Sequence, residues 1–344
     1  MCEFMKKGLE ISKAYFEEYG RPMLEEQFPE VLPYLAAGLM GSGSECFGFD
    51  DEVSRDHDFE PGFCLFLPGE DVVDRRTAFL LERAYAKLPK EFGGLKRSLM
   101  QPVGGPRHGV LRTEEFFRER LGEGLCRDLL RAAEDGADSD APERRADTAE
   151  SSGEYKAWLA LPEQSLAEAV NGEIFFDHYG EVSRIRRGAA FYPEDVRRKK
   201  LAGYLLLMAQ AGQYNYTRCL AHGETAAAQL AVCEFVKSAC GSIFLLNKVY
   251  QPYYKWTFRA LRALPLLFEE AELLEYLLTT DNAPETAEEK YGVIEGIAAD
   301  VIEVLTDQGL TEADCGDLEK HAYSVNDGIA DGELRNLHIL AGVS

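Results

Sequence analysis

The sequence predicts an α+β fold, in which a mixed sheet with flanking helices comes first and an all-helical bundle follows. Two observations support this prediction. Short apolar runs that end in Gly or Pro, typical of strands, occur only before about residue 190. From Pro193 onward, apolar residues recur at helical spacing almost to the end of the chain. We therefore expect an α/β domain over 1–190 and a helical bundle domain over 191–344.

The elements of the first domain follow from hydrophobic spacing and from the residues that interrupt it. An amphipathic helix is expected up to about Leu32, and a buried strand in the second half of 31–40 enters the glycine loop 41–44. A second strand within 62–68 stops at a Pro-Gly pair. The remaining elements are a helix over 72–88, a strand over 109–112, a helix that starts at Thr113, and a strand over 173–177.

The second domain contains long apolar-periodic stretches, which predict helices over 195–211, 225–249, 264–279, 285–305 and 318–336. Pro193 suits the first position of the helix that opens this domain. Between the predicted elements of the first domain, 132–153 holds mostly Ala, Asp, Glu, Arg and Ser, which predicts an acidic, flexible insertion.

Charge and cysteine usage limit the classes of function. The formal net charge is −23, which argues against a long nucleic acid as partner because phosphate neutralisation needs a basic face. No apolar run approaches the length of about 20 residues that spans a membrane, so no membrane partner is expected. Eight cysteines are scattered without a CxxC pair, which predicts reduced thiols and a cytoplasmic location. Neither a zinc motif nor a P-loop or Rossmann glycine motif is present.

The pattern that carries chemistry is Gly43-Ser44 followed by Asp56-His57-Asp58. A Gly-Ser turn after a strand lets backbone amides and the serine hydroxyl approach a phosphate. Two carboxylates at i and i+2 on a strand share one face and form a hard oxygen site suited to Mg²⁺. Mg²⁺ between carboxylates and a triphosphate is the arrangement for in-line nucleotidyl transfer. The other interpretation is a glycine turn followed by an acidic loop that caps a strand.

A third carboxylate from another strand would complete a two-metal site and help to deprotonate the acceptor hydroxyl. The candidates are Glu173 and Asp177, which lie on one face of the predicted strand 173–177. The sequence pattern alone does not favour Glu173 or Asp177.

The run 41–59, GSGSECFGFDDEVSRDHDF, resembles the hallmark of the bacterial domain-of-unknown-function family 4037. That family is similar to the nucleotidyltransferase superfamily, which includes kanamycin nucleotidyltransferase and DNA polymerase beta. The sequence departs from the family at 59–61, where Phe-Glu-Pro stands in place of Trp-Gly-Pro. Further matches are Trp158-Leu159-Ala160, Pro162-Glu163-Gln164, Phe175-Phe176-Asp177, Gly180-Glu181, 192–196, 213–216 with Arg218, and Asn247 with Tyr250, Pro252, Tyr253, Lys255 and Trp256.

The resemblance implies a Mg²⁺-dependent nucleotidyltransferase that moves a nucleoside monophosphate from an NTP to a hydroxyl-bearing small molecule or protein. Asp56 and Asp58 would hold the metal, and Gly43 and Ser44 would hold phosphate. The resemblance favours Asp177 over Glu173 as the third acid. The alternative is a catalytically inactive nucleotide-binding or regulatory module of the same fold. No motif assigns the acceptor, the nucleobase or the oligomeric state.

Other polar residues have two interpretations each. Arg55 either pairs with a phosphate or neutralises the neighbouring acids. Lys255, which follows Tyr253 and Tyr254, either reaches a triphosphate while the tyrosines stack on a base, or belongs to a helix start packed by aromatics. Gln213 and Asn215 either contact the nucleotide or form a hydrogen-bond network. The basic runs 184–187 and 197–200 are interpreted as a solvated face rather than a ligand patch.

Overall fold

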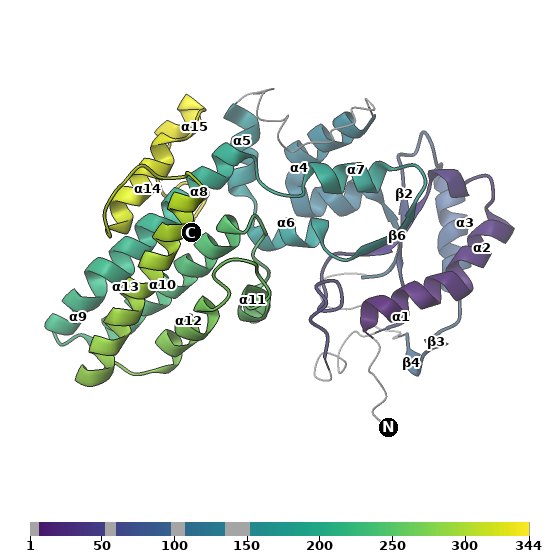
Figure 1. The fold of residues 1–344 in the computed structure, drawn as a ribbon. Helices are drawn as coiled ribbons and strands as arrows, with labels where there is room; N and C mark the ends of the chain where they lie inside the picture. The colour runs from purple at the N-terminus through teal and green to yellow at the C-terminus, as the bar shows by residue number, and fades with distance from the viewer. Residues whose placement is uncertain (1–6, 52–59, 98–106, 135–151, 344) are drawn as a thin grey trace. The chain divides into compact units, whose positions relative to one another are not determined.

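The computed structural model describes residues 7–51, 60–97, 107–134 and 152–343 (Figure 1). Within them the chain forms two compact units, Met1–Asp140 with Ser165–Ala190, and Ala141–Gln164 with Phe191–Ser344. The first holds a small mixed sheet and the second is helical, which confirms the α+β class. The described part of 141–164 belongs with the second unit, whereas the expected domain over 1–190 included it. Most of the expected insertion 132–153 lies outside the described residues.

The first unit contains helices before, between and after its strands. Its elements are α1 (Gly8–Tyr15), η1 (Phe16–Gly20), α2 (Arg21–Gln27), η2 (Leu32–Tyr34), β1 (Ala36–Leu39), β2 (Cys64–Leu67), α3 (Arg75–Ala86), β3 (Glu91–Phe92), β4 (Leu95–Lys96), β5 (Gly109–Arg112), α4 (Thr113–Glu134), β6 (Glu173–Asp177) and α7 (Glu181–Gly188). The strands expected around 36–40, 62–68, 109–112 and 173–177 are all present. The β3–β4 hairpin and the π-helical turn η1 were not predicted.

The main sheet of the first unit has the strand order β5-β2-β1-β6. β1 pairs antiparallel with both β2 and β6, while β2 pairs parallel with β5. Every residue of β1 and β2 is buried, because helices cover both faces of the sheet centre. This burial explains why both strands consist of continuous apolar residues rather than an alternating pattern.

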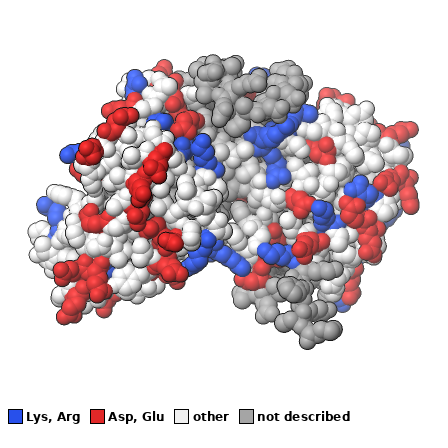
Figure 2. Space-filling model, in the orientation of Figure 1, with Lys and Arg blue, Asp and Glu red and all other residues white. Residues whose placement is uncertain are grey.

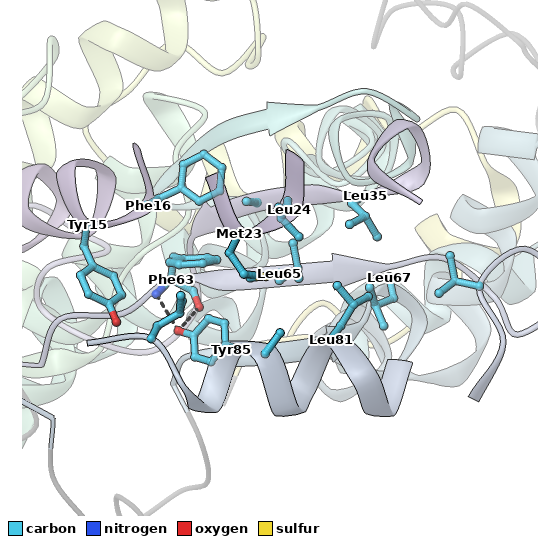
Figure 3. Close-up of a cluster of buried hydrophobic side chains, with 14 residues drawn as sticks. Tyr15, Phe16, Met23, Leu24, Leu35, Phe63, Leu65, Leu67, Leu81 and Tyr85 are labelled. Atoms are coloured by element: carbon cyan, nitrogen blue, oxygen red, sulfur yellow. Dashed lines mark hydrogen bonds between the residues drawn. The ribbon is translucent and has the colours of Figure 1, made fainter. Parts of the chain in front are cut away.

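Side chains of β2 alternate between two layers of the core. Leu65 and Leu67 join a cluster formed with the N-terminal helices and α3, while Phe66 packs on the opposite face, with its ring 5.1 Å from that of Phe116 in α4. Figure 3 shows the first layer, where the hydroxyl of Tyr85 accepts from Phe63 N at 3.0 Å and donates to Phe63 O at 2.7 Å. Tyr85 thus fixes the backbone at the point where the chain enters β2.

The second unit is built around two long helices that pack on each other, α8 and α10. The boundary between the units falls within α6, whose first two residues are assigned to the second unit. The elements are α5 (Ser152–Ala160), α6 (Glu163–Val170), α8 (Glu194–Met208), η5 (Ala209–Tyr216), α9 (Thr217–Ala221), α10 (Thr225–Leu246), α11 (Tyr254–Leu261), α12 (Glu270–Thr279), α13 (Pro284–Asp307), α14 (Leu318–Asp327) and α15 (Gly332–Asn336).

Helix boundaries in the second unit differ from the expected ones in three places. Pro193 is the N-cap of α8 rather than its first residue. The stretch expected as one helix over 264–279 becomes helical only at Glu270, and the one expected over 318–336 is divided into α14 and α15. η5 continues α8 as a π-helix, a conformation that periodicity does not distinguish from an α-helix.

One helix in the described part of the chain, α10, is long and apolar enough to cross a membrane by length and composition alone. The expectation that no apolar run approaches that length was therefore too strict. The most apolar stretch of α10 has a mean hydropathy of 1.4, and 67% of it is buried within the protein. α10 is accordingly the core helix of the second unit.

Candidate functional site

The Gly-Ser loop that follows β1 is held by Asn171, the residue that ends the helical segment before β6. The side-chain oxygen of Asn171 accepts from Gly41 N at 2.9 Å, and its amide nitrogen donates to Gly41 O at 2.8 Å. Arg186 of α7 in turn donates to the backbone oxygen of Asn171 at 2.7 Å. Gly41 and Gly43 have φ values of +106° and +138°, which favour glycine. The loop is therefore anchored to the segment that leads into β6, the strand that carries the candidate third acid.

Glu45 covers Gly43 within this loop. The Glu45 side chain is buried, and a Cβ placed on Gly43 would lie 2.5 Å from its Oε1. Burial raises the pKa of Glu45, while the charge of Arg107 and a hydrogen bond with Ser44 act in the opposite direction. Ser44 therefore already has a partner, and a phosphate that approaches the loop would meet a carboxylate. A cation beside Glu45 would remove this conflict.

The strand register decides which acid lies near the Gly-Ser loop. Leu39, at the loop end of β1, is opposite Glu173, whereas Ala36, at the other end, is opposite Asp177. The start of β2 also lies at the loop end, because Cys64 is opposite Gly38. The sheet thus brings together the loop, Glu173 and the entry to β2, and it leaves Asp177 away from them.

Asp177 has a structural role at its own end of β6. Its Oδ1 accepts from Gly180 N and its Oδ2 from Ser183 N, both at 2.7 Å, so both oxygens hold the turn and the first residues of α7. A carboxylate at a helix N-terminus is stabilising in this way. The register and these hydrogen bonds therefore favour Glu173 over Asp177 as the acid beside the loop.

Glu173 forms an ion pair with Lys13 of α1. The two side chains are 40% and 49% exposed, respectively, so solvent competes with the pair and it contributes little to stability. The pair raises the pKa of Lys13 through the hydrogen bond and then through the charge of Glu173. Glu173 can therefore exchange this partner for another cation at small cost.

Asp56, Asp58 and Arg55 lie outside the described residues, as does the rest of 52–59. The described residues on either side of this segment are held at the loop end of the sheet. Asp50 accepts from Gly8 N at 2.8 Å, and Glu60 lines a small cavity together with Glu45 and Leu39. In the ranges that are described, no group of three His, Cys, Asp or Glu side chains is arranged to hold a metal ion.

Two predicted site residues of the second unit, Tyr253 and Lys255, lie at the start of α11. Both are exposed, and Figure 2 shows Lys and Arg side chains gathered over this helix. Lys255 Nζ is 4.8 Å from the ring centre of Trp256, and the rings of Tyr253 and Tyr254 are 4.3 Å apart. This arrangement combines an accessible cation with an accessible aromatic surface.

Gln213 and Asn215 lie in η5 and face a different pocket, of about 710 Å³, from the one that Tyr253 lines. Gln213 Nε2 donates to Glu295 and to Gly316 O at 3.0 and 2.8 Å, and its Oε1 accepts from Leu318 N at 3.0 Å. These bonds match the network interpretation of Gln213. The structure therefore does not bring Gln213 and Asn215 together with Tyr253.

The pocket beside Tyr253 contains residues that the sequence analysis missed. It measures about 660 Å³ and includes Glu163, Lys200 and Tyr204 among its lining residues. Lys200 belongs to the basic run 197–200, whose interpretation as a solvated face was wrong. Arg197, Lys199 and Lys200 are only 3%, 0% and 3% exposed. Pro162-Glu163-Gln164 was noted only as part of the family resemblance.

Residues 158–257 match a family described as Domain of unknown function (DUF4037). The matched stretch contains most of the residues that line the 660 Å³ pocket, and it includes β6 of the first unit. No curated protein and no solved structure matches the chain.

Proposed function

We propose that this protein is a Mg²⁺-dependent nucleotidyltransferase that moves a nucleoside monophosphate from an NTP to a hydroxyl-bearing small molecule or protein. The observation that carries the proposal is that three candidate parts of a nucleotide site lie at the same end of the sheet. There, the anchored Gly-Ser loop lies beside Glu173 and beside the entry to β2, the strand that follows Asp56 and Asp58 in the chain. Strand, Gly-Ser, Asp-x-Asp and strand occur in the order that this chemistry needs.

Each residue has a proposed role. Asp56 and Asp58 hold Mg²⁺, and Glu173 completes the carboxylate set once it leaves Lys13. Carboxylate oxygens are the ligands that Mg²⁺ takes in proteins, and when bound it would neutralise charge on the triphosphate. The backbone of Gly43 and the hydroxyl of Ser44 bind phosphate. Because Glu45 already holds Ser44, nucleotide binding would need Glu45 to be protonated or paired with a cation.

The experiment that tests this proposal compares two acids of β6 in a transfer assay with labelled NTP and a set of hydroxyl-bearing acceptors. Glu173→Gln removes the charge of a residue that is 40% exposed, so the fold should survive while label transfer and pyrophosphate release are lost. Asp177→Asn should keep transfer and lower stability, because it weakens the bonds at the start of α7. Full transfer by Glu173→Gln, or loss only in Asp177→Asn, would contradict the assignment.

A second candidate function is a nucleotide-binding or regulatory module without turnover. One observation favours it: in the structure Glu173 is paired with Lys13, and both oxygens of Asp177 are used at α7. Such a module would bind NTP and release no pyrophosphate with any acceptor. The same transfer assay therefore separates the two functions.

The net charge of −23 suits a cationic acceptor and disfavours a long nucleic acid. We also propose that the protein acts in the cytoplasm, since reduced thiols are typical of that compartment. The described cysteines are free thiols, which supports this proposed location.

A further inference from the structure

The 660 Å³ pocket of the second unit lies between segments that are far apart in the sequence. Its walls come from 159–164, which runs from the end of α5 to the start of α6, from α8 and α10, from 251–254, which runs into the start of α11, and from Gly342 with Val343. Its volume falls within the range of about 300–1,000 Å³ that is usual for small-molecule sites. The pocket is thus large enough for a ligand and is formed by one compact unit.

A buried ion pair lies at this pocket. Lys200 is 3% exposed, and its Nζ donates to Gly342 O at 2.6 Å and lies 3.3 Å from Glu163 Oε1. The hydroxyl of Tyr204 also donates to Glu163 Oε1, at 3.2 Å. Burying two charges costs desolvation energy, so such a pair is weak evidence for stability. The pair lies on the wall of the cavity, so a ligand bound there would meet its fixed charges.

A buried tyrosine hydroxyl that has no partner within the described ranges lies near this ion pair. Tyr192 is 6% exposed, and its ring centre is 5.4 Å from Lys200 Nζ. Among the described residues its hydroxyl makes no hydrogen bond, an arrangement that costs free energy in a closed protein interior. The polar groups around Lys200 are therefore not all used by the fold itself.

The rim of the pocket is aromatic and its surroundings are basic. Tyr253 and Tyr254 are 39% and 74% exposed, so their rings are open to a planar partner. Lys237 of α10 lines the same pocket. α11 begins beside the pocket, and its N-terminus has no side-chain cap. The positive end of the helix dipole therefore adds to the positive potential at the rim. A planar ring would stack on the tyrosines, and an anionic group would be attracted to the basic side.

We propose that this pocket binds a ligand that combines a planar ring with an anionic group, the chemistry of a nucleotide. The inference rests on the proposed function only for the choice of a nucleotide as that ligand. It assigns Tyr254, Lys237 and the Glu163–Lys200 pair to ligand binding. Of these, the sequence predicted only Tyr254, as one of two tyrosines that stack on a base.

The test measures binding by calorimetry in buffer that contains a chelator and no divalent cation. The probes are ATP, adenosine and tripolyphosphate, which separate the ring from the charge. ATP should bind, and each of the other two should bind at least about tenfold more weakly. Tyr254→Ala should weaken ATP binding about tenfold, the scale of one base–aromatic stacking contact, and Lys237→Gln should weaken it too. Both residues are exposed, so both variants should fold.

Tyr323→Ala is the matched control, because Tyr323 is an exposed tyrosine of the same unit that does not line this pocket, and it should leave binding unchanged. The double variant Asp56→Ala, Asp58→Ala should also keep this metal-free binding. That result would support the inference even if no transfer activity exists. The inference is overturned if ATP does not bind without metal, if tripolyphosphate binds as tightly as ATP, or if Tyr254→Ala binds ATP like the wild type.

Discussion

The substitution Gly43→Ala tests whether the Gly-Ser loop must keep its conformation to bind nucleotide. Gly43 has φ +138°, and the new Cβ would lie 2.5 Å from Glu45 Oε1. Alanine in the left-handed region costs about 1–2 kcal/mol. The carboxylate of Glu45, itself 6% exposed, must also move, which disturbs its hydrogen bond with Ser44. The variant should therefore lose both stability and binding.

Gly109→Ala is the matched control for this substitution. Gly109 has φ +127° in β5, which β2 separates from β1, and no neighbouring atom of the described residues lies within 4 Å of its added Cβ. Both variants should lose about 1–2 kcal/mol of unfolding free energy from backbone strain, with a larger loss for Gly43→Ala. Only Gly43→Ala should weaken NTP binding, by at least about tenfold or about 1.4 kcal/mol.

The assay is calorimetric titration of both variants with NTP and Mg²⁺, paired with urea unfolding to confirm that each protein is folded. Equal binding by Gly43→Ala and wild type would refute the argument that this loop binds the triphosphate. Equal losses in the two variants would show that general destabilisation, rather than the contact with Glu45, causes the effect.

Three further changes test the fold of the two units. Asn171→Ala removes two hydrogen bonds to Gly41 and should lower the free energy of unfolding, measured by urea titration, by about 1–3 kcal/mol. An unchanged unfolding midpoint would show that Asn171 does not hold the loop. Tyr85→Phe removes the acceptor of the buried Phe63 N–H, while Phe63 O keeps its bond from Gly109 N. The variant should lose about 1–3 kcal/mol in the same measurement, and a neutral result would mean that another group replaces the hydroxyl. Burial, and then Asp300, raise the pKa of Glu270 from 4.5 to about 7, so the folded chain keeps this proton after the unfolded chain has lost it. Stability should therefore fall as the pH rises from about 4.5 to about 7, and Glu270→Gln should reduce that fall by about 1–3 kcal/mol; parallel pH profiles for the two proteins would contradict the raised pKa.

The two central strands of the first unit, β1 and β2, were predictable because they are apolar on both faces and end at Gly or Pro. Gly38 to Gly41 and Leu67-Pro68 mark the ends of β1 and β2 in the sequence as they do in the structure. Order and pairing depend on contacts between distant segments, which a single sequence does not contain. The register of β6 against β1 is the clearest case, since it reverses the preference between Glu173 and Asp177.

The buried charges of the second unit were not predictable from composition. The run 197–200 has the pattern of a solvated basic face, yet Lys199 Nζ donates to backbone oxygens of Arg335 and Leu337 in the distant C-terminal segment. A buried lysine is stable when such partners satisfy it, and those partners lie more than 130 residues away in the chain. Similarly, Glu163 and Lys200 approach each other only because α8 packs beside the start of α6.

The measurement that tests the central claim most directly is the effect of Mg²⁺ on NTP binding, by calorimetry, in the wild type and in the double variant Asp56→Ala, Asp58→Ala. The proposed metal site predicts that Mg²⁺ tightens NTP binding in the wild type and that the double variant loses this gain. If Mg²⁺ changes the affinity equally in both proteins, or in neither, Asp56 and Asp58 do not hold the metal and the nucleotidyltransferase proposal fails.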